Sequence, residues 1–191
     1  LETRSLAESA VPDPGLTTFT IERDRRWVIP ILREILAINP DIEIVASPWS
    51  APAWMKDTNN YIYGTLRQDQ EHTFAQYLVR FLEAYRDEGI AIDWLTVQNE
   101  PHAVFLDTPS MVMSSDQQAR LIRDHLGPAL VQAGLAPSLA FDVAVRAVRQ
   151  RAGHLQVQRP AQVVVELVAA RRLQHPFVAP PVLQVGQHRQ D

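Results

Sequence analysis

The chain has 191 residues, of which 46% are apolar, and its formal net charge is −4. This composition indicates a globular protein, and the charge gives no reason to expect nucleic acid or an anionic membrane surface as a partner. The chain contains no cysteine, which excludes disulfides, thiol catalysis and Cys-ligated metals, and it has no apolar run long enough to span a bilayer.

The first residue is Leu1, and no basic-then-apolar leader follows it. We therefore expect a fragment whose true N-terminus is missing, so the lack of a signal peptide says nothing about secretion. Residues 1–20 contain Pro12, Pro14 and Gly15 and are predicted to form a loop-rich segment.

The first predicted helix covers residues 24–38, where apolar residues recur at helical spacing. Pro30 lies inside this run. Because proline is tolerated in the first turn of a helix, we expect the helix to begin near Pro30. Asn39, Pro40 and Asp41 are expected to end it.

Two apolar segments with strand character flank a strongly amphipathic helix. The first strand is predicted over residues 42–46, and residues 57–70 form a polar loop after it. The helix covers residues 71–87 and is closed by Gly89. The second strand is predicted over residues 90–97. One apolar stripe of the helix consists of Phe74, Tyr77, Leu78, Phe81, Leu82 and Tyr85.

A third helix and a third strand are predicted further along the chain. The helix covers residues 115–133 and begins at an N-cap formed by Ser115. Pro128 is expected to bend or interrupt it. The strand is predicted over residues 138–145.

The alternation of helices and strands predicts parallel βα units with right-handed crossovers. Three strands cannot close a barrel, so we expect a piece of a larger α/β fold. Residues 42–46 and 92–98 should be adjacent parallel strands, which would place Trp49 and Glu100 at the same end of the sheet.

The composition changes after Asp142. Residues 143–191 contain seven arginines and eight glutamines but only two acidic residues. We therefore divide the chain into residues 1–142 and a dissimilar basic tail, residues 143–191. The tail is interpreted as a separate basic segment, a disordered terminus or, preferably, frame-shifted sequence, and it should be poorly ordered. Only residues 161–170 have a run that could form a strand or short helix.

The residues after the second strand carry the strongest chemical signal. Gln98, Asn99 and Glu100 follow an apolar strand, and Pro101 ends further strand pairing. Proteins built on parallel strands place their chemistry at this end. Glu100 is therefore the first candidate for a working carboxyl group, with Asn99 as its hydrogen-bonding partner. The alternative is a strand that ends in an ordinary polar loop.

Aromatic residues follow the first strand. Trp49 and Trp54 offer flat apolar faces for a sugar ring, although tryptophans are more often packed in a core, an alternative that we favour more for Trp54. His102 lies close to Glu100 and is interpreted as a solvated loop residue. The histidines show no metal-ligand spacing, so we expect no cofactor and no metal.

The two motifs that follow the strands are specific in combination. Residues 46–56 read Ala-Ser-Pro-Trp-Ser-Ala-Pro-Ala-Trp-Met-Lys, and residues 96–101 read Thr-Val-Gln-Asn-Glu-Pro. Their order and spacing resemble glycoside hydrolase family 30, which holds glucosylceramidases and β-1,6-glucanases. The resemblance covers residues 10–142.

This resemblance implies part of a (β/α)8 TIM barrel that hydrolyses β-glycosides with retention of configuration. Glu100 aligns with the general acid/base of the family, a role that it suits if partial burial keeps it protonated. Asn99 aligns with the residue that binds the 2-hydroxyl of the sugar, and Trp49 with an aromatic wall. The family also implies an extracellular location.

The nucleophile of the family, a second glutamate at the end of the seventh barrel strand, has no match in this chain. Glu166 follows three valines but lies in the dissimilar tail, too few elements after Glu100, and we reject it as the nucleophile. We therefore expect the chain to be inactive alone.

The functional prediction is a retaining β-glycoside hydrolase of the glucosylceramidase or β-1,6-glucanase type, acting on a β-linked glycan or glycolipid. One alternative is another retaining barrel glycosidase, such as a xylanase or endoglucanase. Another is a carbohydrate-binding fragment without catalysis, which would bind glycans but not turn them over.

Overall fold

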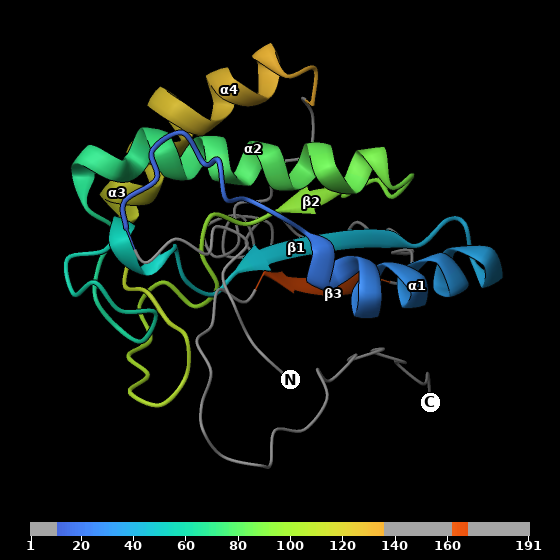
Figure 1. The fold of residues 1–191 in the computed structure, drawn as a ribbon, viewed down its shortest axis with the longest axis horizontal. Helices are drawn as coiled ribbons and strands as arrows, with labels where there is room; N and C mark the ends of the chain where they lie inside the picture. The colour runs from blue at the N-terminus through green and yellow to red at the C-terminus, as the bar shows by residue number, and fades with distance from the viewer. Residues whose placement is uncertain (1–10, 136–161, 168–191) are drawn as a thin grey trace, which may run out of the picture.

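The computed structural model describes residues 11–135 and 162–167. A three-stranded parallel sheet lies at its centre, with helices packed against it (Figure 1). The helical and strand elements, in chain order, are α1 (Glu22–Ile38), β1 (Glu43–Pro48), two 3-10 turns (Ala53–Met55 and Gln68–Gln70), α2 (Glu71–Asp87), β2 (Trp94–Leu95), α3 (Ser115–Arg120), a π-helical segment (Leu121–Leu126), α4 (Gly127–Gln132) and β3 (Gln162–Leu167).

Helix α1 begins at Glu22, earlier than the start near Pro30 that the sequence predicted. Pro30 lies inside the helix, where its ring removes one backbone hydrogen bond. The apolar face of the helix compensates for this loss, because Ile29 and Leu32 are buried on either side of the proline. The helix ends before Asn39, as predicted.

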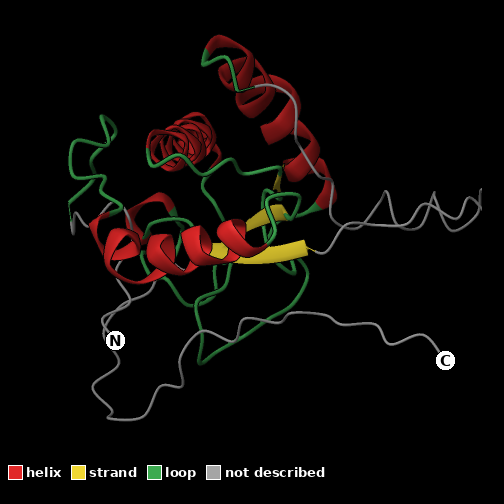
Figure 2. Cartoon of the chain, turned by 90° about the vertical axis from the view of Figure 1, so that its right-hand side faces the viewer, coloured by secondary structure: helices red, strands yellow, loops and turns green. Residues whose placement is uncertain are grey.

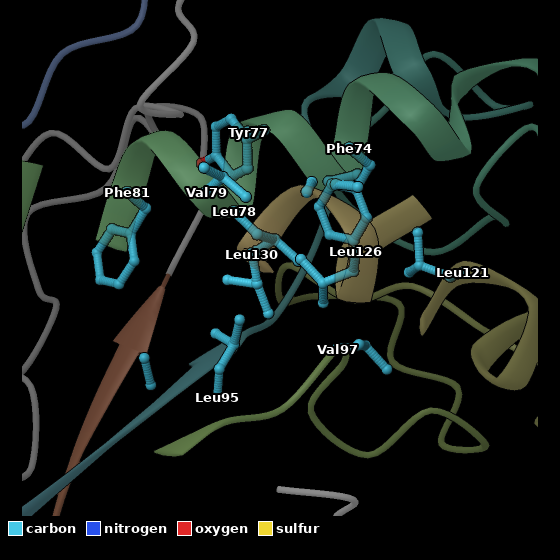
Figure 3. Packing of buried hydrophobic residues seen from close by; sticks show 14 of the residues in the cluster. Phe74, Tyr77, Leu78, Val79, Phe81, Leu95, Val97, Leu121, Leu126 and Leu130 are labelled. Atoms are coloured by element: carbon cyan, nitrogen blue, oxygen red, sulfur yellow. The ribbon is translucent and has the colours of Figure 1, made fainter. Parts of the chain in front are cut away.

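Helix α2 has the predicted bounds, and it contributes seven of the 26 buried hydrophobic residues that form the core of the described chain. Phe74, Leu78, Phe81 and Tyr85 are completely buried. Figure 3 shows Phe74, Leu78 and Phe81 on the side of α2 that faces Leu95 of β2 and the leucines of the π-helical and α4 segments. The period of the stripe therefore predicted both the element and the face that it buries.

The sheet has the strand order β2-β1-β3, and both pairings are parallel. Val45 pairs with Trp94 and Ala46 with Leu95. This confirms that the strands predicted over residues 42–46 and 92–98 are adjacent and parallel, joined by α2 in a βαβ unit.

Strand β2 is shorter than the predicted residues 90–97. The reason lies in the ladder to β1: the amide of Ile44 donates to the side-chain Oδ2 of Asp93, at 2.7 Å, and not to a backbone carbonyl. Backbone bonds resume on either side, since Asp93 N donates to Ile44 O and Thr96 N to Ala46 O, each at 2.9 Å. The chain is therefore extended beside β1 over a longer stretch than its two ladder residues.

The third predicted helix, residues 115–133, is interrupted as expected, and the structure shows the form of the interruption. Its N-cap is Ser114, one residue earlier than predicted, whose Oγ accepts from the amide of Gln117 at 3.2 Å. The amide of Gly127 bonds to the carbonyl of Ile122, which is a π-type contact. Pro128 follows directly and has no amide to continue the regular ladder.

Beyond residue 135 the structure describes only β3. The run at residues 161–170, predicted as a strand or short helix, is a strand over Gln162–Leu167 that pairs along all of β1. The strand predicted over residues 138–145 lies outside the described residues, as does most of the tail whose poor order was predicted.

Candidate functional site

Residues 49–56 leave the sheet after β1, and residues 98–101 leave it after β2 and its extended continuation. These two segments, which we call the strand exits, lie side by side. Asn99 N donates to Pro48 O at 2.8 Å, and Gln98 Nε2 donates to Trp49 O at 2.8 Å. The prediction that Trp49 and Glu100 lie at the same end of the sheet is therefore confirmed. Figure 2 shows the loops beside, between and below the helices and strands.

Glu100 occupies an exposed position with a left-handed backbone, φ +43°. Its carbonyl accepts from Ala103 N at 2.9 Å, which closes a turn directly after the strand exit. Its carboxyl group makes no hydrogen bond or ion pair with another described residue. The partial burial that the acid role requires is therefore not supplied by the described part of the chain.

The backbone of Glu100 gives a testable expectation. A non-glycine residue at positive φ is strained by roughly 1 kcal/mol, and such strain is common at functional sites. Glu100→Gly should raise the free energy of unfolding by up to about 1 kcal/mol in chemical denaturation. Glu100→Ala is the matched control and should give no such gain, because alanine keeps the strain. Equal stability of both variants would show that the turn is unstrained.

Asn99 and Trp49 are both half-buried at the strand exits. The carbonyl of Asn99 accepts from Gln98 Nε2 at 3.0 Å, and its side-chain amide has no partner among the described residues. The indole Nε1 of Trp49 is buried without an acceptor there. Among the described residues, the side-chain amide of Asn99 is therefore unpartnered, whereas Trp49 Nε1 is enclosed by the chain.

Trp54 is 4% exposed and belongs to the hydrophobic core. Its indole Nε1 also lacks an acceptor among the described residues. This burial agrees with core packing, which the sequence analysis favoured for Trp54. Contact of Trp54 with a substrate stays a prediction.

Lys56, the single lysine of the chain, is a buried residue to which no local sequence pattern assigned a role. Its Nζ donates to Ser50 Oγ at 3.0 Å, Tyr61 O at 3.1 Å and Ser110 O at 2.7 Å. It thereby joins three loop segments at the strand exits. Burial lowers the pKa of Lys56 to about 7, although the charge of Asp57 acts in the opposite direction.

Two further acidic groups, buried Glu71 and half-buried Asp24, hold helices together. Burial tends to raise the pKa of Glu71, but hydrogen bonds from Arg120 and Gln117 outweigh this effect and keep the pKa below its usual value. Burial raises the pKa of Asp24, which accepts a hydrogen bond from Tyr85 Oη at 3.0 Å. The hydrogen bonds of these groups link α2 to α3 and to α1, so their role is structural.

The described residues contain no group of histidine, aspartate or glutamate side chains that could hold a metal ion. The expected lack of a cofactor stays a prediction. Among the same residues, no helix is both long and apolar enough to cross a membrane.

Residues 6–164 match the profile of the glycosyl hydrolase family 30 TIM-barrel domain. The chain belongs to glycosyl hydrolase family 30. The resemblance read from the two motifs is thus confirmed, and the parallel βα units are part of a TIM-barrel domain. The match continues to residue 164, past the expected end at Asp142, while the proposed domain boundary itself stays a prediction.

The relatives that match this chain are named either as endo-1,6-β-D-glucanases or as glucosylceramidases. The chain is 38% identical over 136 residues to an endo-1,6-β-D-glucanase of Neurospora crassa, covering 68% of this chain and 28% of the relative. It is 33% identical over 129 residues to the lysosomal acid glucosylceramidase of Mus musculus, covering 62% and 25%. The chain therefore spans little more than a quarter of the length of the relatives that it matches.

Two solved structures superpose on this chain. SrfJ from Salmonella typhimurium superposes with a TM-score of 0.62 at 31% identity, covering 70% of this chain and 31% of that one. The endo-β-1,6-glucanase BT3312 gives a TM-score of 0.63 at 31% identity, covering 72% and 32%.

Proposed function

We propose that this chain supplies the acid/base side of a retaining β-glycoside hydrolase. The observation that carries the proposal is the joining of the two strand exits, where Asn99 N bonds to Pro48 O and Gln98 bonds to Trp49 O. This arrangement brings a carboxyl group, an amide and an aromatic ring to one end of parallel strands, where such folds place their active sites.

Each of these residues has a role in the proposal. Glu100 protonates the departing glycosidic oxygen and then removes a proton from the attacking water. Asn99 bonds the 2-hydroxyl of the sugar, an interaction that strengthens as the transition state forms. Trp49 packs its ring against the C–H face of the sugar, and Trp54 supports that wall from the core.

A retaining enzyme also needs a carboxylate nucleophile about 5–5.5 Å from the acid/base carboxyl. Among the described residues, no acidic side chain forms a hydrogen bond with the carboxyl group of Glu100. Glu166 lies on β3, which is separated from β2 by β1, and its backbone pairs with Ser47. We propose that Glu166 is not the nucleophile and that this carboxylate comes from outside the 191 residues.

The proposed substrate is a β-linked glucoside, with β-1,6-glucan favoured over glucosylceramide. The support is the order of identities: three fungal endo-1,6-β-D-glucanases are 34–38% identical to this chain, and the named glucosylceramidases are 30–33% identical. In both cases the sugar ring would occupy the same strand exits.

The test is sugar binding by the 191-residue chain, followed by tryptophan fluorescence. Gentiobiose, a β-1,6-linked glucose disaccharide, should change the emission more strongly than β-1,4-linked cellobiose at equal concentration. Trp49→Phe should remove most of the change. Trp27→Phe is the matched control, because Trp27 is 61% exposed on α1 and should not respond. A response that survives Trp49→Phe would contradict the proposed site.

A companion assay distinguishes binding from turnover. The same chain incubated with an aryl β-glucoside should release no detectable aglycone, because in this proposal the carboxylate that forms the glycosyl intermediate comes from outside the 191 residues. Release that Glu100→Gln abolishes would show that a nucleophile is present after all, and Glu166 would then return as its candidate.

A further inference from the structure

The side chain of Gln98 bridges the two strand exits. It is 2% exposed, and its single Nε2 group donates to two backbone carbonyls, Trp49 O at 2.8 Å and Asn99 O at 3.0 Å. Both neighbours are acceptors, so the amide must present its nitrogen to them. One side chain thereby fixes the residue that follows β1 relative to the residue that precedes Glu100.

The amide oxygen of Gln98 has no donor among the described residues. A buried oxygen without a donor lowers the stability of the fold. Methionine would fill nearly the same space without that loss. The benefit of a glutamine at this position therefore lies in the two hydrogen bonds that its side-chain nitrogen donates.

Strand pairing does not require this amide. Just before the exits, the hydroxyls of Ser47 and Thr96 lie 2.6 Å apart, and Thr96 N donates to Ala46 O at 2.9 Å. These contacts already join β1 to the segment that carries β2. The hydrogen bonds of Gln98 lie beyond these contacts, where the segments after β1 and β2 leave the sheet.

We infer that Gln98 is a positioning residue of the proposed sugar site. Its two donated bonds hold the ring of Trp49 at a fixed position relative to Asn99 and Glu100. The consequence for sugar binding rests on the proposed function, whereas the positioning itself can be measured without a ligand.

The experiment uses the 191-residue chain with ¹⁵N-labelled tryptophan indoles, and Trp49→Phe identifies the Trp49 resonance. Gln98→Met should shift the indole N–H resonance of Trp49 and leave that of Trp27 in place. Thr96→Val is the matched control, because it removes a buried cross-strand hydrogen bond that does not touch Trp49. It should leave the Trp49 resonance unmoved even if it destabilises the chain equally.

Gln98→Glu provides a second measurement if Gln98→Met does not fold. Its carboxylate would face two carbonyl oxygens, so the Trp49 resonance should be displaced at neutral pH. Protonation restores one donor, and the resonance should therefore move back toward its wild-type position as the pH falls toward the carboxyl range. A residue that only fills space would show no such return.

Titration with methyl β-D-glucopyranoside then connects positioning to function. Gln98→Met should weaken binding ~10-fold, the effect of about one lost hydrogen bond, and Thr96→Val should not. An unmoved Trp49 resonance in Gln98→Met, or an equal shift in Thr96→Val, would overturn the inference. If the wild-type chain binds no sugar but Gln98→Met shifts Trp49, the proposed function fails and the positioning role stands.

Discussion

Lys56→Met is expected to lower the free energy of unfolding by about 2 kcal/mol at pH 9, where the neutral amine of Lys56 donates two hydrogen bonds worth about 1 kcal/mol each. The acceptors within its reach are Ser50 Oγ, Tyr61 O and Ser110 O, which belong to three different loop segments. Tyr61 O also accepts from Ser110 N at 3.0 Å, so it keeps a donor in the variant. Methionine fits the space of the lysine stem but donates to none of them. Urea denaturation measures the loss.

The same substitution should cost less at pH 6, and the sign follows from proton binding. Burial lowers the pKa of folded Lys56 to about 7, whereas an unfolded lysine titrates near pH 10.4. Between these values the unfolded chain binds more protons, so wild-type stability rises with pH. At pH 6 both states are protonated and the folded chain contains an unfavourable buried charge.

Denaturation curves at intervals from pH 6 to 9.5, below the range in which ordinary tyrosines titrate, test this dependence. The wild-type chain should gain stability across the range, and Lys56→Met should lack that gain. Arg26→Met, which removes an exposed cation of α1, is the control and should change stability by no more than about 0.5 kcal/mol. Parallel curves for the wild type and Lys56→Met would show that Lys56 stays charged.

The largest expected effect on activity is that of Glu100→Gln in a longer homologous barrel that contains these residues. Hydrolysis of substrates with poor leaving groups should fall roughly 10²–10⁴-fold, because no group protonates the departing oxygen. Activated aryl glycosides should lose less in the first step, since their leaving groups need little protonation. Steady-state kinetics on the two substrate classes measures the difference.

Azide provides the control for that substitution. It attacks a glycosyl intermediate without help from a base, so it should partly restore turnover of the aryl glycoside by Glu100→Gln. Equal losses on both substrate classes, with no effect of azide, would mean that Glu100 is not the acid/base. A substitution at His102, an exposed loop residue two positions further on, should leave the kinetics within a few-fold of the wild type.

Helix α2 shows what local sequence is able to determine. Its apolar residues recur at helical spacing over a length sufficient to fix both ends and the buried face, and Gly89 adopts the left-handed backbone, φ +76°, expected after a helix. The strand patterns on either side, joined by this helix, limited the pairing to a parallel one. The same two strands then placed Trp49 and Glu100 at one end.

Helix α1 and strand β2 show where local rules fail. The preference of proline for a first turn predicted a late start for α1, but burial of Ile29 and Leu32 stabilises a helix that passes through Pro30. The apolar run at residues 90–97 predicted a longer strand than β2. The carboxylate of Asp93 takes one ladder bond from Ile44, a contact between residues 49 positions apart.

The sequence by itself therefore determined the family, the βαβ unit and the candidate residues Glu100, Asn99 and Trp49, because each depends on a short motif or a regular period. The tertiary structure alone decided what surrounds them: the exposure of Glu100, the burial of Lys56 and the bridge made by Gln98. Burial and donor–acceptor pairing depend on which distant segments meet. In the case of Gln98 and Lys56 those partners lie up to 54 residues away, where no local pattern records them.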